Sequence, residues 1–155
     1  MRKAFVLVWL LFISGIPLPV KAETPVQPVP SAAVTIEEVR QFMEEYKNRL
    51  KKMEVDPFME LFSREAVENQ VLPYADIRQG YLATFENSDA ILYHLDVYSI
   101  QTRPEGALVS GRYEMIQSLK GRSKQKTFRG NIQWDLVREG GLLKIKELKY
   151  GRGPE

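Results

Sequence analysis

Three polar residues, His94, Asp96 and Tyr98, follow one another at every second position. On a β-strand, this spacing places all three side chains on one face. A histidine or a carboxylate can abstract a proton, and a tyrosine hydroxyl can stabilise the oxyanion that forms. The pattern is that of a small acid–base site, such as an isomerase or a hydro-lyase requires.

The same segment has a second interpretation, because Tyr93, Leu95 and Val97 occupy the alternate positions. If these residues face the core, His94 and Asp96 lie on the solvent side of the strand. The alternation favours this arrangement. Catalysis by His94 and Asp96 is kept as the alternative.

Five aromatic residues and one arginine are candidates for lining a small-molecule site: Tyr46, Tyr74, Tyr81, Arg112, Tyr113 and Trp134. Such sites combine apolar walls with a few hydroxyl or amide groups, and an arginine can anchor an anion. Core packing is the simpler account of Tyr46 and Tyr81, which fall on apolar helix stripes, and of Tyr113 and Trp134 on strand faces. Arg112 alternates with Tyr113, so we expect it on an outward face, solvated or paired.

Composition excludes several kinds of chemistry. The chain has no cysteine and one histidine, so disulfides, thiolate catalysis and a multi-histidine metal site are impossible within it. We predict neither a metal nor a cofactor. The chain has 22 Lys and Arg against 20 Asp and Glu, and three of the basic residues precede position 23. Residues 23–155 thus keep 19 basic and 20 acidic side chains, which argues against nucleic acid as a partner.

The first 22 residues predict an export signal. Arg2 and Lys3 precede an apolar run at residues 4–13, and the segment ends on Val20-Lys21-Ala22. A basic start, a short apolar core and a small-x-small end are typical of a secretory signal peptide, and the run is too short to span a membrane. We expect cleavage near Ala22 and a periplasmic or extracellular protein. An uncleaved membrane anchor is the alternative.

The next segment, residues 23–33, contains three prolines and predicts an extended leader. The folded domain is expected at residues 34–150, with a tail at 151–155. Thr35 and Glu38 have capping-box spacing, and an apolar stripe follows: Val39, Phe42, Met43, Tyr46, Leu50 and Met53. This predicts a helix that packs by one face. Asp56 before Pro57 predicts the start of a second helix, and a third is expected from residue 74 to about 85.

Strand patterns dominate the rest of the chain. One short strand is expected within residues 65–72, and four longer ones at 90–103, 107–119, 127–138 and 142–150. A turn at 104–106 joins the first two of these longer strands, and a turn at 139–141 joins the last two. Three helices followed by strands without helical crossovers predict an α+β fold, with the helices packed on a curved, mostly antiparallel sheet.

Residues 53–67, which read MEVDPFMELFSREAV, and residues 134–145, which read WDLVREGGLLKI, resemble the nuclear transport factor 2-like superfamily. Leu143 stands where that superfamily usually has tryptophan. The resemblance covers residues 34–150, and its SnoaL-like and L,D-transpeptidase-associated bacterial branches are the most similar. It implies a cone-shaped sheet around a long helix, with a pocket inside. The superfamily hosts isomerases, dehydratases, cyclases and non-catalytic modules, so the fold alone does not fix the chemistry.

Charge and exposed apolar residues suggest two surfaces. Lys120, Arg122, Lys124 and Lys126 form a basic connection between two strands, which could contact an anionic membrane surface, a glycan or an acidic partner. A solvated hairpin whose lysines discourage edge pairing is the simpler account. The second surface is the face of the sheet opposite the one that carries Val109, Met115 and Trp134. Leu108, Ile116 and Val137 lie on it, and we expect a modest homodimer through that face.

These observations favour a non-catalytic binding or interaction module of the bacterial cell envelope. Its partner would be an envelope protein, a glycan or a small apolar ligand. A small-molecule isomerase or hydro-lyase that uses the cone pocket is the alternative.

Overall fold

The computed structural model describes residues 33–152. In chain order, these contain α1 (Ile36–Lys52), α2 (Val55–Met59), β1 (Phe62–Glu68), β2 (Leu72–Pro73), α3 (Tyr74–Glu86), β3 (Ser88–Arg103), β4 (Gly106–Leu119), β5 (Gln125–Glu139) and β6 (Leu142–Arg152). The predicted signal peptide, nearly all of the predicted leader and the last three residues lie outside the described part of the chain. No helix between residues 33 and 152 has the length and apolar character needed to cross a membrane.

All six strands belong to one sheet, with the order β2-β1-β6-β5-β4-β3. Strands β3 to β6 form the antiparallel meander that the turns and the alternation predict. Strand β1 instead pairs in parallel with β6, where Phe62 opposes Ile145 and Glu68 opposes Leu148. The α+β class with a mostly antiparallel sheet is therefore confirmed. The one parallel pair brings the end of β1 beside the end of β6.

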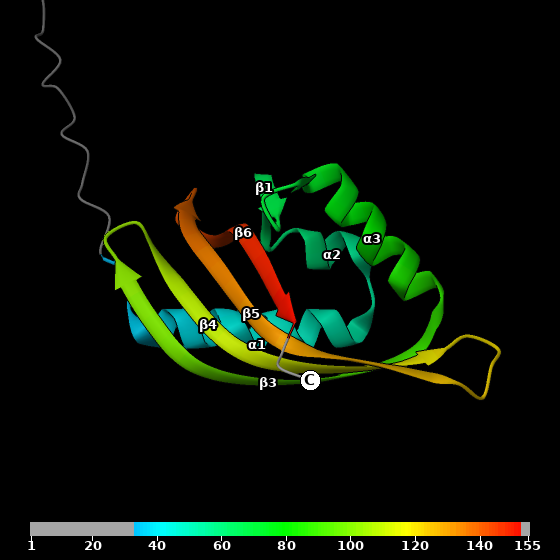
Figure 1. The fold of residues 1–155 in the computed structure, drawn as a ribbon. Helices are drawn as coiled ribbons and strands as arrows, with labels where there is room; N and C mark the ends of the chain where they lie inside the picture. The colour runs from blue at the N-terminus through cyan, green and yellow to red at the C-terminus, as the bar shows by residue number, and fades with distance from the viewer. Residues whose placement is uncertain (1–32, 153–155) are drawn as a thin grey trace, which may run out of the picture.

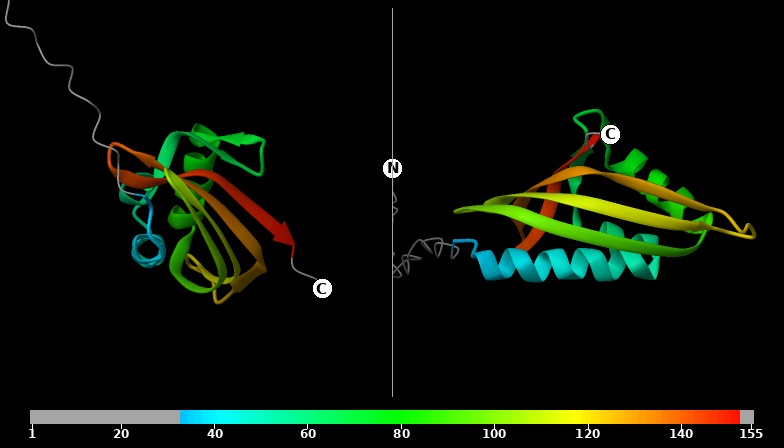
Figure 2. Two further views of the ribbon diagram at one scale, coloured as in Figure 1. Left: turned by 90° about the vertical axis from the view of Figure 1, so that its left-hand side faces the viewer. Right: turned by 60° about the horizontal axis from the view of Figure 1, so that its bottom comes forward.

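The sheet is strongly curved, and the helices lie on its concave side (Figure 1 and Figure 2). Helix α1 packs along β3, whereas α3 packs against β1 and β2. Between these layers, Tyr46, Phe58 and Trp134 are fully buried. The ring of Tyr46 meets that of Trp134 edge-on at a centroid distance of 5.6 Å, and it is tilted against that of Phe58 at 5.3 Å. Aromatic packing of this kind stabilises the inside of the cone.

Helix α1 forms as its sequence predicts. The Thr35 hydroxyl accepts the backbone N–H of Glu38 at 3.1 Å, and five residues of the predicted stripe are buried: Val39, Phe42, Met43, Tyr46 and Leu50. The sixth, Met53, is the C-cap, with a left-handed φ of 55° and its N–H bonded to the Leu50 carbonyl. The stripe ends where the backbone leaves the helix.

The short helix α2 differs from the prediction at its start. Its N-cap is Glu54 without a side-chain cap, and Asp56 lies inside the first turn. The carboxylate of Asp56 accepts a 2.6 Å hydrogen bond from Arg78 on α3 instead. Asp56 thus links two helices, because its side chain reaches a cation and not the backbone N–H groups of its own helix.

The predicted strand at residues 65–72 is in fact two strands. Strand β1 ends at Glu68, and Asn69 and Gln70 turn the chain with φ values of 51° and 63°. Asparagine tolerates this left-handed region better than most residues. Strand β2 then pairs back on β1, with Leu72 opposite Glu68. This turn fixes Glu68 at the end of its strand, beside β6.

Candidate functional site

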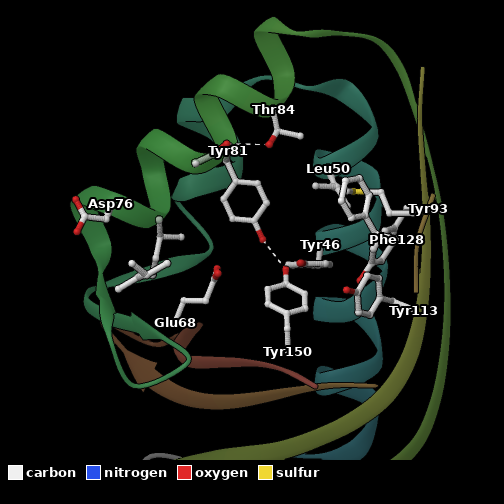
Figure 3. A pocket seen from close by; sticks show the side chains of 14 residues that line it. Tyr46, Leu50, Glu68, Asp76, Tyr81, Thr84, Tyr93, Tyr113, Phe128 and Tyr150 are labelled. Carbon is white, nitrogen blue, oxygen red and sulfur yellow. Dashed lines mark hydrogen bonds between the residues drawn. The ribbon is translucent and has the colours of Figure 1, made fainter. Parts of the chain in front are cut away.

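A cavity of about 260 Å³ opens between α1, α3 and the inner face of the sheet. Figure 3 shows that aromatic side chains from several elements converge on it. Its lining comprises Tyr46, Leu50, Glu68, Leu72, Asp76, Ile77, Gly80, Tyr81, Thr84, Tyr93, Tyr113, Met115, Phe128 and Tyr150. The walls are mostly apolar, whereas five tyrosine hydroxyls supply most of the polar groups. This combination is typical of a small-molecule site.

Two of the hydroxyls are bonded to each other. Those of Tyr81 and Tyr150 lie 2.9 Å apart, and either can donate. The ring of Tyr113 meets that of Tyr150 edge-on at 5.4 Å and stacks on that of Tyr93 at 6.2 Å. Because the rings support one another, the hydroxyls are held in place before anything binds.

Two further hydroxyls, those of Tyr46 and Tyr93, are buried and make no hydrogen bond of good geometry within residues 33–152, although Tyr46 interacts with Tyr81 and Tyr150, and Tyr93 with Tyr46. Tyr46 is completely buried, and Tyr93 is 5% exposed. The hydroxyl of Tyr46 lies beside the Tyr81–Tyr150 pair (Figure 3). A buried hydroxyl without a partner costs about 1–3 kcal/mol. Both side chains line the cavity, where their hydroxyls join those of Tyr81 and Tyr150 in one polar cluster.

Burial sets the protonation of these groups. It raises the pKa of Tyr46, Tyr81 and Tyr150 well above the usual value, and it also raises the pKa of Tyr93 and Tyr113. Loss of hydration disfavours the phenolate in each case. All five tyrosines are thus neutral hydrogen-bond donors at physiological pH.

Glu68 brings a carboxyl group into the same cavity. It comes from the end of β1, and its side chain points toward the Tyr81–Tyr150 pair (Figure 3). Burial raises the pKa of Glu68 above its ordinary value, and no hydrogen bond or ion pair to its carboxylate is found in the described chain. The other acid of the lining, Asp76, is exposed. Glu68 is therefore the acid placed for proton exchange with a bound molecule.

Backbone contacts explain why Glu68 and Tyr150 meet. The side-chain oxygen of Asn69 accepts the N–H of Tyr150 at 2.8 Å, and the N–H of Asn69 donates to the Leu148 carbonyl at 2.8 Å. The turn that ends β1 is thus fastened to the last strand. Glu68 on one side of this junction and Tyr150 on the other both face the cavity.

The structure brings together three of the six residues expected to line a site, namely Tyr46, Tyr81 and Tyr113. Tyr74 lies outside the lining, where the Arg64 guanidinium sits 4.8 Å from its ring centroid. Trp134 is fully buried against Tyr46 and belongs to the core.

Arg112 is on the outer face, where it donates to Asp96 at 2.9 Å with both side chains largely exposed. His94 and Asp96 share that exposed face, and His94 lies opposite Glu114 of β4. Neither reaches the cavity, because the alternation directs Tyr93 inward and its neighbours outward. Acid–base catalysis by this pair in the cone therefore has no geometric basis.

The lining residues that the expected site lacked include Glu68, Tyr93 and Tyr150. The alternation of β3 already assigns Tyr93 to the inner face, and Tyr150 follows Leu148 at the strand spacing. Glu68 follows the buried Ala66 by two positions. Each had a local signal, but only the pairing of β1 with β6 shows that they share a cavity.

The predicted dimer face is the convex side of the sheet. Leu108, Ile116 and Val137 are each partly buried there. Ion pairs cross the same face, between Arg129 and Glu114 and between Arg103 and Asp135. The homodimer stays a prediction. Between residues 33 and 152, no three histidine or acidic side chains cluster closely enough to hold a metal ion.

No protein-family model matches the sequence, and no curated protein matches it. Solved structures do match. One is a proposed aromatic ring hydroxylase from Novosphingobium aromaticivorans, with 16% identity, a TM-score of 0.68 and coverage of 79% of this chain and 93% of that chain. A second is a proposed scytalone dehydratase from the same organism, with 11% identity, a TM-score of 0.63 and coverage of 74% and 81%.

A third match is a nuclear transport factor 2-like superfamily protein from Salmonella enterica serovar Typhimurium. Its identity is 13% and its TM-score 0.66, and the match covers 77% of this chain and 91% of that chain. At such identities the likeness establishes the fold and leaves the activity open. The chain therefore has the α+β cone fold of the nuclear transport factor 2-like superfamily.

Proposed function

We propose that the protein is a binding module of the bacterial cell envelope that holds a small, largely apolar, oxygen-bearing molecule in the tyrosine-lined cavity. The observation that carries this proposal is the cavity itself, whose mostly apolar walls hold the hydroxyl groups of five tyrosines, two of which make no hydrogen bond of good geometry in the described chain. A ligand oxygen would satisfy them, while the surrounding rings bury its apolar body. The envelope location rests on the export signal predicted at residues 1–22.

Direct binding of a fluorescent probe tests the proposal. 2-Naphthol combines an aromatic body with one hydroxyl group, and we expect it to bind the wild-type protein. Tyr46→Phe and Tyr93→Phe should each raise its Kd about fivefold, since each removes one hydrogen bond worth about 1 kcal/mol. Tyr98→Phe is the matched control, because Tyr98 is 60% exposed on β3 and does not line the cavity. No binding, or equal effects of all three substitutions, would overturn the proposal.

A second candidate function is proton transfer, which Glu68 favours. Its carboxylate could remove a proton from a carbon next to a ketone, while a tyrosine hydroxyl donates to the ketone oxygen as negative charge develops there. The carbon–hydrogen bond breaks, the proton moves to Glu68, and the enolate oxygen is stabilised until the proton returns. The raised pKa of Glu68 makes it a stronger base than an exposed carboxylate.

Hydrogen–deuterium exchange separates binding from catalysis. In D₂O, the catalytic alternative predicts that the wild-type protein exchanges the α-protons of 2-tetralone above the background rate. Glu68→Gln should abolish the exchange, and Asp76→Asn should retain it, because Asp76 is exposed at the cavity mouth. If 2-tetralone binds but its α-protons exchange only at the background rate, the catalytic alternative is wrong and the non-catalytic binding module is retained.

A further inference from the structure

A second hollow lies next to the tyrosine cavity, at the far end of the β4–β5 hairpin. It has a volume of about 450 Å³ and is lined by Ala83, Thr84, Asn87, Gln117, Leu119, Lys120, Arg122, Lys126 and Phe128. Thr84 and Phe128 also line the tyrosine cavity. In Figure 1 the C-terminal half of α3 lies above this end of the hairpin. The two hollows are neighbours with a shared wall.

Strand register shows that the two spaces follow one continuous surface. Met115 opposes Phe128, and both line the tyrosine cavity. Gln117 opposes Lys126 two residues further along, and both line the second hollow. Residues two apart share a face and are separated by about 7 Å. One short step along the hairpin therefore leads from aromatic walls to a cationic rim.

The charge of this rim has no counterpart within the hollow. Lys120, Arg122 and Lys126 are exposed, no acidic residue is in the lining, and none of the three forms an ion pair with another described residue. The carboxylate of Asp89 accepts the backbone N–H of Gly121 at 3.3 Å and is not in the lining. Three unpaired cations around one hollow attract an anion.

The C-terminal end of α3 borders the hollow. The free carbonyls of a helix C-terminus repel an anion, but this repulsion is weakened here because the carbonyls already accept hydrogen bonds. The Thr84 carbonyl accepts the Ser88 hydroxyl at 2.5 Å, and the Ala83 carbonyl accepts the Asn87 side-chain amide at 2.7 Å. The Asn87 carbonyl accepts the N–H of Lys120 at 2.9 Å. This last bond also fastens the hairpin to the end of α3.

We propose that the two hollows form one bipartite site for an anionic amphiphile, a molecule with an apolar body and a single carboxylate or phosphate group. The body lies in the tyrosine cavity, and the anionic group lies among Lys120, Arg122 and Lys126. This inference rests on the proposed binding function of the cavity. The orientation is fixed by charge, because Glu68 and Asp76 lie on the opposite side of the cavity from Phe128 (Figure 3).

Calorimetric titration with three ligands of equal chain length tests the proposal: octanol, octanoate and octyl phosphate. We expect both anions to bind the wild-type protein at least tenfold more tightly than octanol. The triple variant Lys120→Gln, Arg122→Gln, Lys126→Gln should lose that advantage, about tenfold in Kd, while its octanol affinity stays the same. Unchanged octanol binding also shows that the variant is folded.

Lys124 supplies the matched control, since it lies in the same connection but not in the lining of the hollow. Lys124→Gln should leave all three affinities within twofold of wild type. If Lys124→Gln weakens anion binding as much as each lining substitution does, the attraction is that of a diffuse basic surface and the bipartite site is wrong. Comparing octanoate with octyl phosphate shows whether the rim prefers one anion.

Failure of this inference is distinguishable from failure of the proposed function. If octanol and 2-naphthol bind but octanoate binds no more tightly than octanol, the cavity binds ligands and the cationic rim does not take part. If neither octanol nor 2-naphthol binds, the cavity itself is not a ligand site and both proposals fall. Phe128 belongs to the wall that the two hollows share. If Phe128→Asp does not weaken the binding of octanoate, the two hollows do not form one site.

Discussion

The hydroxyl groups of Tyr81 and Tyr150 lie 2.9 Å apart, although 69 positions separate the two residues in the chain. One comes from α3 and the other from β6, so this hydrogen bond links the helix layer to the sheet inside the cavity. The burial that raises the pKa of both residues keeps them protonated. The pair therefore acts as a neutral strut and remains able to donate one hydrogen bond to a ligand.

Tyr150→Phe should weaken the fold. It removes the strut and leaves the Tyr81 hydroxyl without its partner, so we expect the free energy of unfolding to fall by about 1–2 kcal/mol. Urea denaturation followed by tryptophan fluorescence measures the loss. Tyr98→Phe, on the exposed side of β3, should change it by less than about 0.5 kcal/mol. Equal stability of Tyr150→Phe and wild type would show that the strut contributes nothing.

Tyr46→Phe should act in the opposite direction on stability. The Tyr46 hydroxyl is buried and makes no hydrogen bond of good geometry in the described chain, so its removal should raise the free energy of unfolding by about 1 kcal/mol. The same substitution is expected to weaken 2-naphthol binding. A gain in stability together with a loss of affinity is the signature of a group kept for binding. A variant less stable than wild type would show that Tyr46 has a structural partner.

Much of this arrangement follows from local patterns. Helical spacing placed Tyr46 and Tyr81 on apolar stripes, and alternation favoured an outward position for His94 and Asp96, where they lie. Both patterns work because they depend on neighbouring positions along one element. The cone shape came from the resemblance of two segments to a known superfamily, and the solved structures support it.

The centre of the site could not be predicted in this way. Glu68 and Tyr150 meet because β1 pairs in parallel with β6 and because Asn69 takes a left-handed conformation and accepts the N–H of Tyr150. Neither the register of two distant strands nor such a side-chain bond leaves a periodic signal. The basic connection was recognised as a charged segment. Lys124 lies outside the hollow because of the geometry of the hairpin. The number of charges in a segment gives no information about that geometry.

Glu68 should make stability depend on pH. Its folded-state pKa is raised, so the folded protein binds the proton more tightly than the unfolded chain does. The contribution of Glu68 to stability is therefore fully present below the ordinary glutamate pKa and is lost as pH rises from there through the folded-state pKa. Glu68→Gln, which cannot ionise, should remove this decline. Urea denaturation of both proteins between pH 4 and pH 8 should show that the free energy of unfolding of the variant rises relative to that of wild type as pH increases. A constant difference between the two proteins over this range would contradict the raised pKa.

The export prediction is tested by the N-terminus of the protein recovered from bacterial cells. Residues 1–22 combine a basic start, a short apolar run and a small-x-small end, so we expect a signal peptidase to release a chain that begins near Glu23. Mass spectrometry of the full-length product, expressed with its own N-terminus and taken from the periplasmic fraction, gives the mass directly. An intact Met1 in the membrane fraction would instead support the anchor.

Assembly is decided by the convex face of the sheet. The apolar side chains of Leu108, Ile116 and Val137 favour association, whereas the ion pairs Arg129–Glu114 and Arg103–Asp135 on that face keep part of it hydrated. We expect a weak homodimer, with a Kd in the micromolar range, that Ile116→Lys converts to a monomer. Sedimentation equilibrium of residues 23–155 at increasing concentration measures it, with Leu142→Lys as the control, because Leu142 is 64% exposed in the β5–β6 turn region. A mass that stays at one chain across the whole concentration range would contradict the predicted homodimer.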